Sequence, residues 1–92
     1  MSFDGKSVIV TGGARGIGAA IVEKFASNGA KVSVLDIEPF GGSDHRWSAN
    51  VHSFAGSVAK SETVARFVAD VLNRMGRIDV VVNNAGIVRD NV

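Results

Sequence analysis

The hydrophobic residues of this chain fall into four short runs that alternate with helical or polar stretches. Ser7–Val10 is a continuous run rich in β-branched residues, which is typical of a strand covered on both faces of a parallel sheet. The runs at 31–36 and 78–82 have the same character, and 51–56 is a weaker candidate. The pattern therefore predicts four strands.

A helical pattern follows the first run. Ile17, Ile21 and Phe25 recur at a spacing of four residues, with Ala20 beside them, and predict the helix face that contacts the sheet. An Asn-Gly pair at 28–29 is a common helix stop.

A second helix is predicted between the third and fourth runs. Ser61 is the expected N-cap, and Glu62 places an acid at the positive end of the helix dipole. Gly76 is the expected C-cap. The apolar stripe of this helix consists of Val64, Phe67, Val68, Val71, Leu72 and Met75.

The resulting order is β-α-β-loop-β-α-β, because no helical period of useful length is found in residues 38–50. Alternating strands and helices imply an α/β fold with a parallel sheet and right-handed crossovers. Ninety-two residues make at most one domain, so residues 1–92 are expected to form one partial domain that is truncated after the fourth strand.

Composition narrows the possible functions. A net charge of +1 suggests neither nucleic acid nor an anionic membrane as partner, and no apolar run approaches a membrane span. The absence of cysteine excludes disulfides and thiolate metal sites. His45 and His52 lack the spacing of metal ligands, so no metal site is expected. The start has no signal region, which favours a cytoplasmic protein.

The segment after the first strand carries the main candidate chemistry. Gly12, Gly16 and Gly18 leave the backbone bare where a helix begins, and the unpaired N–H groups there attract a diphosphate. An ordinary tight turn is the alternative. Because a predicted strand precedes the glycines and a predicted helix follows, they indicate the dinucleotide-binding turn of a Rossmann-type doubly wound parallel sheet.

Asp36 closes the second strand 18 residues after Gly18, near the spacing expected of the acid that binds the adenosine ribose. A carboxylate there accepts hydrogen bonds from a 2′-hydroxyl and repels a 2′-phosphate, which favours NAD(H) over NADP(H) as the cofactor. Arg15 weakens this inference, because a cation in the loop could meet a 2′-phosphate. A solvated acid at a strand end is the alternative for Asp36.

Two motifs make the chain similar to the short-chain dehydrogenase/reductase family over essentially its whole length. Residues 11–18 match the signature T-G-x-x-x-G-x-G, and residues 83–86 match the signature N-N-A-G. The resemblance implies a bond from Asn83 to the first strand near Thr11, and a ribose contact from Asp36. It further implies pyrophosphate contacts from Gly12, Arg15, Gly16, Ile17 and Gly18, and contacts on the nicotinamide side from Asn84, Ala85 and Gly86.

The chain departs from the family pattern after the third strand. The family commonly has an acid and a hydrophobic residue there, with the acid near the adenine amino group, and the matching pair here is Ser57-Val58. The region from Asn83 onward is similar to 3-oxoacyl-carrier-protein reductases, whereas the short crossover at 38–50 looks more like dihydrodiol-type dehydrogenases. The choice between these two subfamilies stays open.

The family's catalytic tyrosine and the lysine four residues after it lie beyond the second signature. This chain has no tyrosine, so no catalytic residue is assigned, and the isolated chain is expected to lack significant turnover. Three functions stay open: the NAD(H)-binding portion of an oxidoreductase that transfers hydride to or from an alcohol or carbonyl substrate; a stand-alone or engineered nucleotide-binding fragment without catalysis; or a structural relic without a ligand.

The fourth strand suggests one further partner. In the family's sheet this strand has a neighbour on each side, and the fifth strand has no counterpart in this chain. Val80, Val81 and Val82 are then expected on an open apolar edge, which predicts self-association or pairing with a complementary fragment.

Overall fold

The computed structural model describes residues 2–13, 16–38 and 49–85. Arg15, His45 and Gly86, together with most of the predicted crossover loop, lie outside these residues. The elements are β1 (Ser7–Thr11), α1 (Gly16–Ser27), β2 (Lys31–Asp36), β3 (Val51–Ala55), α2 (Ser61–Met75) and β4 (Val80–Asn83). All six elements correspond to predicted ones, and the largest boundary difference is at β4, which begins two residues later than expected.

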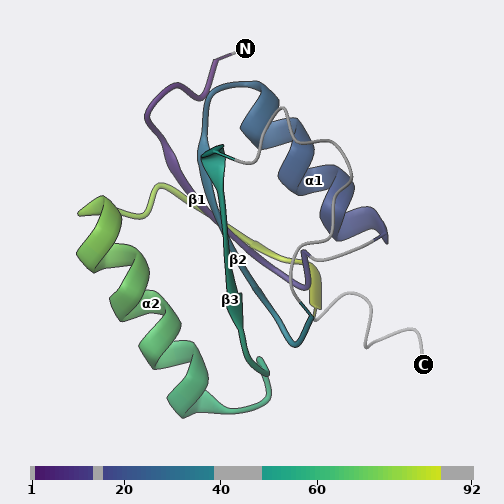
Figure 1. Ribbon diagram of the computed structural model, residues 1–92, viewed down its shortest axis with the longest axis vertical. Coiled ribbons are helices and arrows are strands. Elements are labelled where there is room, and N and C mark those ends of the chain that lie inside the picture. Colours follow the sequence, from purple (N-terminus) through teal and green to yellow (C-terminus); the bar gives the residue numbers. More distant parts are fainter. Residues whose placement is uncertain (1, 14–15, 39–48, 86–92) are drawn as a thin grey trace.

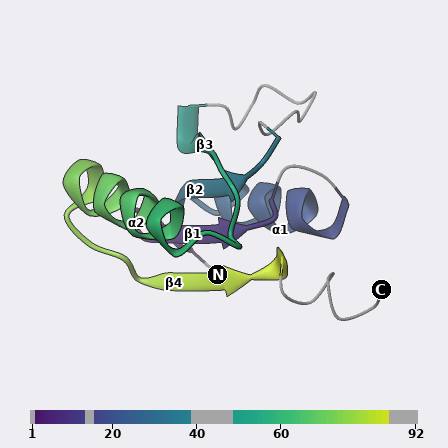
Figure 2. The same ribbon diagram turned by 90° about the horizontal axis from the view of Figure 1, so that it is seen from below.

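The strands form one parallel sheet in the order β3-β2-β1-β4. Figure 2 shows this order along the sheet, with β3 at one edge and β4 at the other. The chain moves outward from β1 to β3 and then returns across the sheet to β4, so the order reverses between β1 and β4. In open α/β sheets, ligands bind outside the carboxyl ends of the strands at such a reversal. The predicted Rossmann-type parallel sheet is confirmed.

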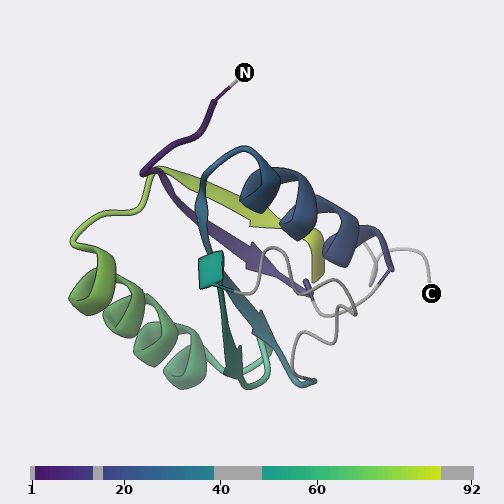
Figure 3. The same cartoon turned by 45° about the horizontal axis from the view of Figure 1, so that its top comes forward.

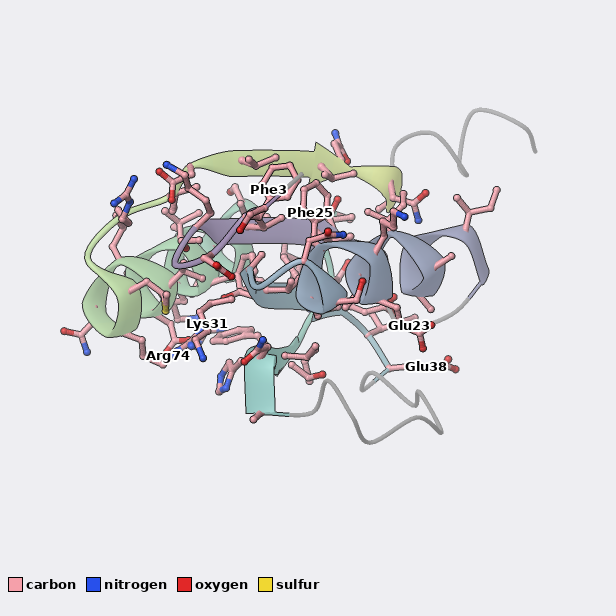
Figure 4. The ribbon with its side chains drawn as sticks, turned by 90° about the horizontal axis from the view of Figure 1, so that it is seen from above. Phe3, Glu23, Phe25, Lys31, Glu38 and Arg74 are labelled. Carbon is pink, nitrogen blue, oxygen red and sulfur yellow. The ribbon has the colours of Figure 1, made fainter. Side chains whose placement is uncertain are left out.

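The two helices cover opposite faces of the sheet (Figures 1 and 3). Because successive strand residues point to opposite faces, β1 supplies Val8 and Val10 to the α1 side and Ile9 to the α2 side. Phe3 extends the α1-side core by an edge-to-face contact with Phe25, their ring centroids 5.0 Å apart (Figure 4). The buried α1-side core is Val8, Val10, Val22, Ala26, Ala30, Val32 and Val34, and the buried α2-side core is Ile9, Leu35, Phe67 and Val71.

The face of α1 that lies against the sheet differs from the prediction. Its buried residues are Gly18, Val22 and Ala26, whereas Ile21 and Phe25 are half-buried on its flank and Ile17 is exposed. Small residues let a helix approach a sheet closely, so they occupy the centre of the contact between α1 and the sheet. A pattern of large hydrophobic residues therefore indicates the flank of this contact instead of its centre. Ile21 and Phe25 thus pack against the core as predicted, whereas the prediction is wrong for Ile17 and missed the buried centre of the contact.

At the two ends of α2, the predicted N-cap is wrong and the predicted C-cap is confirmed. Lys60 occupies the N-cap and makes no side-chain capping bond, so Ser61, predicted as the cap, is the first helical residue. At the other end, Gly76 adopts a left-handed φ of 76° and its N–H donates to the Leu72 carbonyl, as the sequence predicted. Arg74 ties this helix to β2 by donating from Nη2 to Ser33 Oγ at 3.2 Å.

The amino ends of β1 and β4 are held together by a charged clamp. Asp79 Oδ2 accepts a hydrogen bond from the Ser7 backbone N–H at 2.8 Å, and the Asp79 N–H donates to the Ser7 carbonyl at 2.8 Å. Arg77 donates to Asp79 Oδ1 at 2.6 Å from Nη2 and at 3.0 Å from Nε. The Arg77 guanidinium and then the Ser7 N–H hold the pKa of Asp79 below its usual value.

Within the described part of the chain, β4 pairs with β1 and its other edge has no neighbouring strand. Val80 and Val82 pack against the α1-side core, whereas Val81 points to the α2 side and is 63% exposed. Leu72 of α2 is 46% exposed, although the predicted stripe included it.

Candidate functional site

The turn between β1 and α1 is built around two glycines with left-handed backbone. Gly12 has φ +70° and Gly16 has φ +63°, a region that glycine adopts without steric cost. A Cβ on Gly12 would lie 3.0 Å from the Ala85 backbone, so the turn and the end of β4 approach each other closely. A Cβ on Gly16 would meet nothing within 4 Å, because this residue faces open space at the first position of α1.

Gly18 has a different task in the same turn. It is buried, and a Cβ there would collide with the Gly12 carbonyl oxygen and lie 2.7 Å from Asn84 Nδ2. Its missing side chain lets α1 begin directly against the turn. The start of α1, with its unpaired N–H groups and partial positive charge, therefore stays close to the carboxyl end of β1.

Two asparagines at the end of β4 hold this turn in place. Asn84 Nδ2 donates to the Gly12 carbonyl at 2.8 Å, and the residue is only 4% exposed. Thr11 Oγ1 donates to Asn83 Oδ1 at 3.0 Å, which confirms the predicted link between Asn83 and β1. The bracing bond of Asn84 was not foreseen, although two asparagines directly after a buried strand were a signal for polar groups near the turn.

A crevice of about 450 Å³ runs along the carboxyl ends of the strands. This volume lies within the range of small-molecule sites, which is roughly 300–1,000 Å³. The predicted site residues that line the crevice are Gly12, Gly16, Ile17, Asp36, Ser57, Val58, Asn84 and Ala85. Gly18 is buried against the Gly12 carbonyl and Asn84 and does not line the crevice. Arg15 and Gly86 lie outside the described residues. The prediction missed Leu35, Ile37 and Gly56, whose signal was their position next to Asp36 and Ser57 in the sequence.

Asp36 lies at the rim of the crevice where β2 ends. Its Oδ1 accepts a hydrogen bond from the Glu38 backbone N–H at 3.0 Å, which fixes the carboxylate in a local turn. A carboxylate has about four lone-pair positions, so it can accept bonds from a ligand hydroxyl as well. The carbonyl of Asp36 accepts from the Gly56 N–H at 2.9 Å, and this bond holds the end of β3 beside the carboxylate.

The arrangement fits a dinucleotide on grounds of its own geometry. The start of α1, whose first N–H groups have no partner within the helix, borders the crevice at Gly16 and Ile17, and Asp36 supplies an acceptor at the end of β2. No group of three or more potential metal ligands occurs among residues 2–13, 16–38 and 49–85. Neither of the helices in this part of the chain is long and apolar enough to cross a bilayer.

Comparison with known proteins decides the family. Residues 6–92 match the family model described as short chain dehydrogenase. The chain belongs to the short-chain dehydrogenase family. This result confirms the family that the two sequence motifs indicated.

Individual short-chain dehydrogenases give the same result. The chain is 43% identical over 86 residues to L-fucose dehydrogenase of Mus musculus, covering 91% of this chain and 31% of that protein. It is 41% identical over 98 residues to a 3-oxoacyl-[acyl-carrier-protein] reductase of Chlamydia pneumoniae, covering 96% of this chain and 38% of that protein. This likeness agrees with the first of the two predicted subfamilies, and the likeness to dihydrodiol-type dehydrogenases stays a prediction.

The solved structure of the 3-ketoacyl-(acyl-carrier-protein) reductase from Brucella melitensis, complexed with NADH, superposes with a TM-score of 0.78. It is 27% identical and is covered to 34%, with 87% of this chain aligned. The chain thus spans about a third of the length of these relatives. The cytoplasmic location expected from composition stays a prediction.

Proposed function

We propose that residues 1–92 form part of a dinucleotide-binding domain that binds NAD(H) in the crevice along the strand ends. The observation that carries this proposal is the common crevice of the glycine turn, the start of α1 and the carboxylate of Asp36. The N–H groups at the start of α1 would hold the diphosphate, and Asp36 would accept hydrogen bonds from the adenosine ribose.

Strand order sets the order of the ligand groups in this proposal. The ends of β3, β2, β1 and β4 lie side by side, and three strand spacings span about 14 Å. With the diphosphate over β1 and the ribose at Asp36 of β2, the adenine falls beyond β2 toward β3. The nicotinamide then falls on the β4 side, near Asn84 and Ala85.

Titration of the 92-residue chain with NADH and NADPH, followed by the fluorescence of the reduced nicotinamide, tests the proposal. NADH should bind at least about tenfold more tightly, because the carboxylate of Asp36 repels a 2′-phosphate. In Asp36→Ala this preference should shrink to about threefold or less. Glu38→Gln is the matched control, since it removes an acid two residues further on that does not line the crevice. Failure of both dinucleotides to bind would contradict the assignment, and equal binding of both would contradict the role of Asp36.

In a longer protein, this segment would hold the dinucleotide for hydride transfer between the nicotinamide and an alcohol or carbonyl substrate. The 92 residues contain no tyrosine, so a phenol that moves the proton would come from outside them. The loss of such a group costs typically 10²–10⁴-fold in rate. The purified 92-residue chain should therefore bind NADH without oxidising it in the presence of simple carbonyl compounds, and robust turnover would contradict this view.

The same lack of a tyrosine favours the second candidate, a nucleotide-binding fragment without catalysis. The two candidates differ in what a longer reading frame would contain. A Tyr-x-x-x-Lys motif further along such a frame would favour the enzyme, and an early stop codon would favour the fragment.

The open edge of β4 is the proposed site of self-association. Among residues 2–13, 16–38 and 49–85 no strand lies beyond β4, and the side chains of Val81 and Leu72 are exposed, so this edge offers a template for a second strand. Sedimentation at increasing concentration should reveal dimers, and Val81→Lys should shift the chain toward monomer. The control is Lys31→Ala, an exposed residue of β2, which should leave the association unchanged. A chain that stays monomeric at high concentration would contradict this proposal.

A further inference from the structure

The far end of α1 from the crevice carries an asparagine directly before a glycine. The helix ends at Ser27, and Asn28 and Gly29 follow it. Both residues are half-buried and line a hollow of about 420 Å³, so water reaches them. Asparagine is a thermolabile residue, and a following glycine has no side chain to obstruct attack on the asparagine amide. This pair is therefore a candidate for covalent modification.

The reaction open to this pair is deamidation by way of a succinimide. The Gly29 backbone nitrogen attacks Cγ of Asn28, and a bond forms between these two atoms. The bond from Cγ to Nδ2 breaks, and Nδ2 leaves as ammonia with the proton that the attacking nitrogen has lost. Water then opens the ring at either carbonyl and leaves aspartate or isoaspartate at this position. Nothing is oxidised or reduced, and solvent water is the co-reactant.

The fold engages both reacting groups in hydrogen bonds. The Gly29 N–H donates to the Ala26 carbonyl at 3.0 Å, which retains the proton that the attacking nitrogen must lose. Nδ2 of Asn28 donates to the Lys24 carbonyl at 2.7 Å, which fixes the side-chain amide at the end of α1. Closure of the succinimide ring therefore requires both hydrogen bonds to open.

The amino-terminal segment, residues 2–5, controls the opening of the bond at Gly29. The Asn28 carbonyl and the Gly29 N–H belong to one planar peptide unit, so a rotation that frees the N–H also turns the carbonyl. That carbonyl accepts a hydrogen bond from the Phe3 N–H at 2.8 Å. The Phe3 ring is held against Phe25 (Figure 4), and the Gly5 N–H donates to the Gly29 carbonyl at 3.3 Å. The peptide unit is therefore free to rotate once the amino-terminal segment has moved away.

We propose that Asn28 is a site of spontaneous deamidation whose rate is set by local opening of the amino-terminal segment, and not by unfolding of the whole chain. Local opening breaks the hydrogen bonds of Phe3 and Gly5 and leaves the sheet and α2 in place. It requires less free energy than global unfolding, because chain termini are among the least stable parts of a fold. This inference does not depend on dinucleotide binding.

The experiment follows deamidation of Asn28 by peptide mass spectrometry at mildly alkaline pH without denaturant, in the natural chain, Phe3→Ala and Phe54→Ala. Phe54 is the matched control, because its ring makes an edge-to-face contact with Phe67 on the other face of the sheet, the centroids 5.5 Å apart. Phe3→Ala should speed deamidation at least about fivefold over the natural chain, and Phe54→Ala about twofold or less. Urea unfolding shows beforehand whether each variant is folded.

Hydrogen exchange of the natural chain gives a second measurement, which decides the question if either variant is unfolded. The Gly29 amide should be less protected than the Val71 amide in the α2-side core, because it opens locally. Equal acceleration in two folded variants, or equal protection of the two amides, would overturn the inference, since the whole chain would then unfold first. Absence of deamidation at Asn28 in both the natural chain and a folded Phe3→Ala would also overturn it.

Discussion

The two ends of the β1–β4 pair are joined by different chemistry. At the amino end, the charged pair of Arg77 and Asp79 holds the first residue of β1, with contacts of 2.6–3.0 Å. At the carboxyl end, neutral groups connect the two strands. Asn84 Nδ2 donates to the Gly12 carbonyl at 2.8 Å, and Thr11 Oγ1 donates to Asn83 Oδ1 at 3.0 Å. The crevice lies at the neutral end.

This difference follows from what each end is suited to hold. A carboxylate beside the glycine turn would repel a diphosphate, and an ion pair there would compete with it for hydrogen bonds. Amide and hydroxyl groups brace the same strands without adding a net charge. The amino end has no such constraint, so a charged clamp is tolerated there.

Gly18→Ala should produce the largest effect at the carboxyl end. The new Cβ would collide with the Gly12 carbonyl oxygen and displace either the turn or the start of α1. We expect a loss of about 3 kcal/mol in the free energy of unfolding, measured in urea, together with loss of NADH binding. Ala20→Val, at an exposed position of the same helix, should cost about 0.5 kcal/mol or less. Similar losses in both variants would contradict the close contact.

Asn84→Ala should have the next largest effect. It leaves the Gly12 carbonyl without its side-chain donor at a buried position, which costs about 2 kcal/mol. Urea unfolding measures this loss, and Asn73→Ala on the exposed side of α2 is the control. If the two alanine variants unfold at the same urea concentration, Asn84 does not brace the turn.

Asp79→Asn tests the amino end through pH. Because Arg77 and the Ser7 N–H lower the pKa of Asp79 in the folded chain, its contribution to stability is complete above the unfolded value of about 3.9. That contribution is lost as the pH falls through the lower, folded pKa. The natural chain should therefore lose more stability between pH 6 and pH 2 than Asp79→Asn does, as measured by the urea midpoint.

The control for this pH experiment is Glu23→Gln, which removes a carboxylate of α1 (Figure 4) that is far from Arg77 and Asp79 in the sequence. It should keep more of the acid sensitivity of the natural chain than Asp79→Asn keeps. An unchanged acid response in Asp79→Asn would mean that the clamp does not control stability at low pH.

Ser7→Ala should give the smallest effect, and in the opposite direction. The Ser7 hydroxyl is buried at the amino end without a hydrogen-bond partner, so its removal should raise the free energy of unfolding by about 0.5 kcal/mol. Ser33 is the matched buried serine, and its hydroxyl accepts from Arg74. Ser33→Ala should lower the stability by about 1 kcal/mol. A loss of stability in Ser7→Ala would imply that its hydroxyl has a partner.

The sequence predicted those parts of the molecule that depend on local patterns. β2 was found with its correct bounds because its apolar run ends at an acid, and α2 was found because its stripe is regular. The pattern found the flank of the α1 contact at Ile21 and Phe25 but missed its buried centre, because Gly18 and Ala26 make contact by being small, which a hydrophobic pattern does not record. The bond from Asn84 to Gly12 joins distant parts of the chain, and no local pattern contains it.

That bond also has a consequence for the order of events during synthesis. Gly12 and Asn84 are 72 positions apart, so the turn leaves the ribosome long before the residue that braces it. Contacts between such distant positions form late, because the intervening chain must first be ordered. The ligand crevice is therefore expected to mature only after β4 has joined the sheet, and nascent chains that end before residue 84 should contain the glycines without a working binding site.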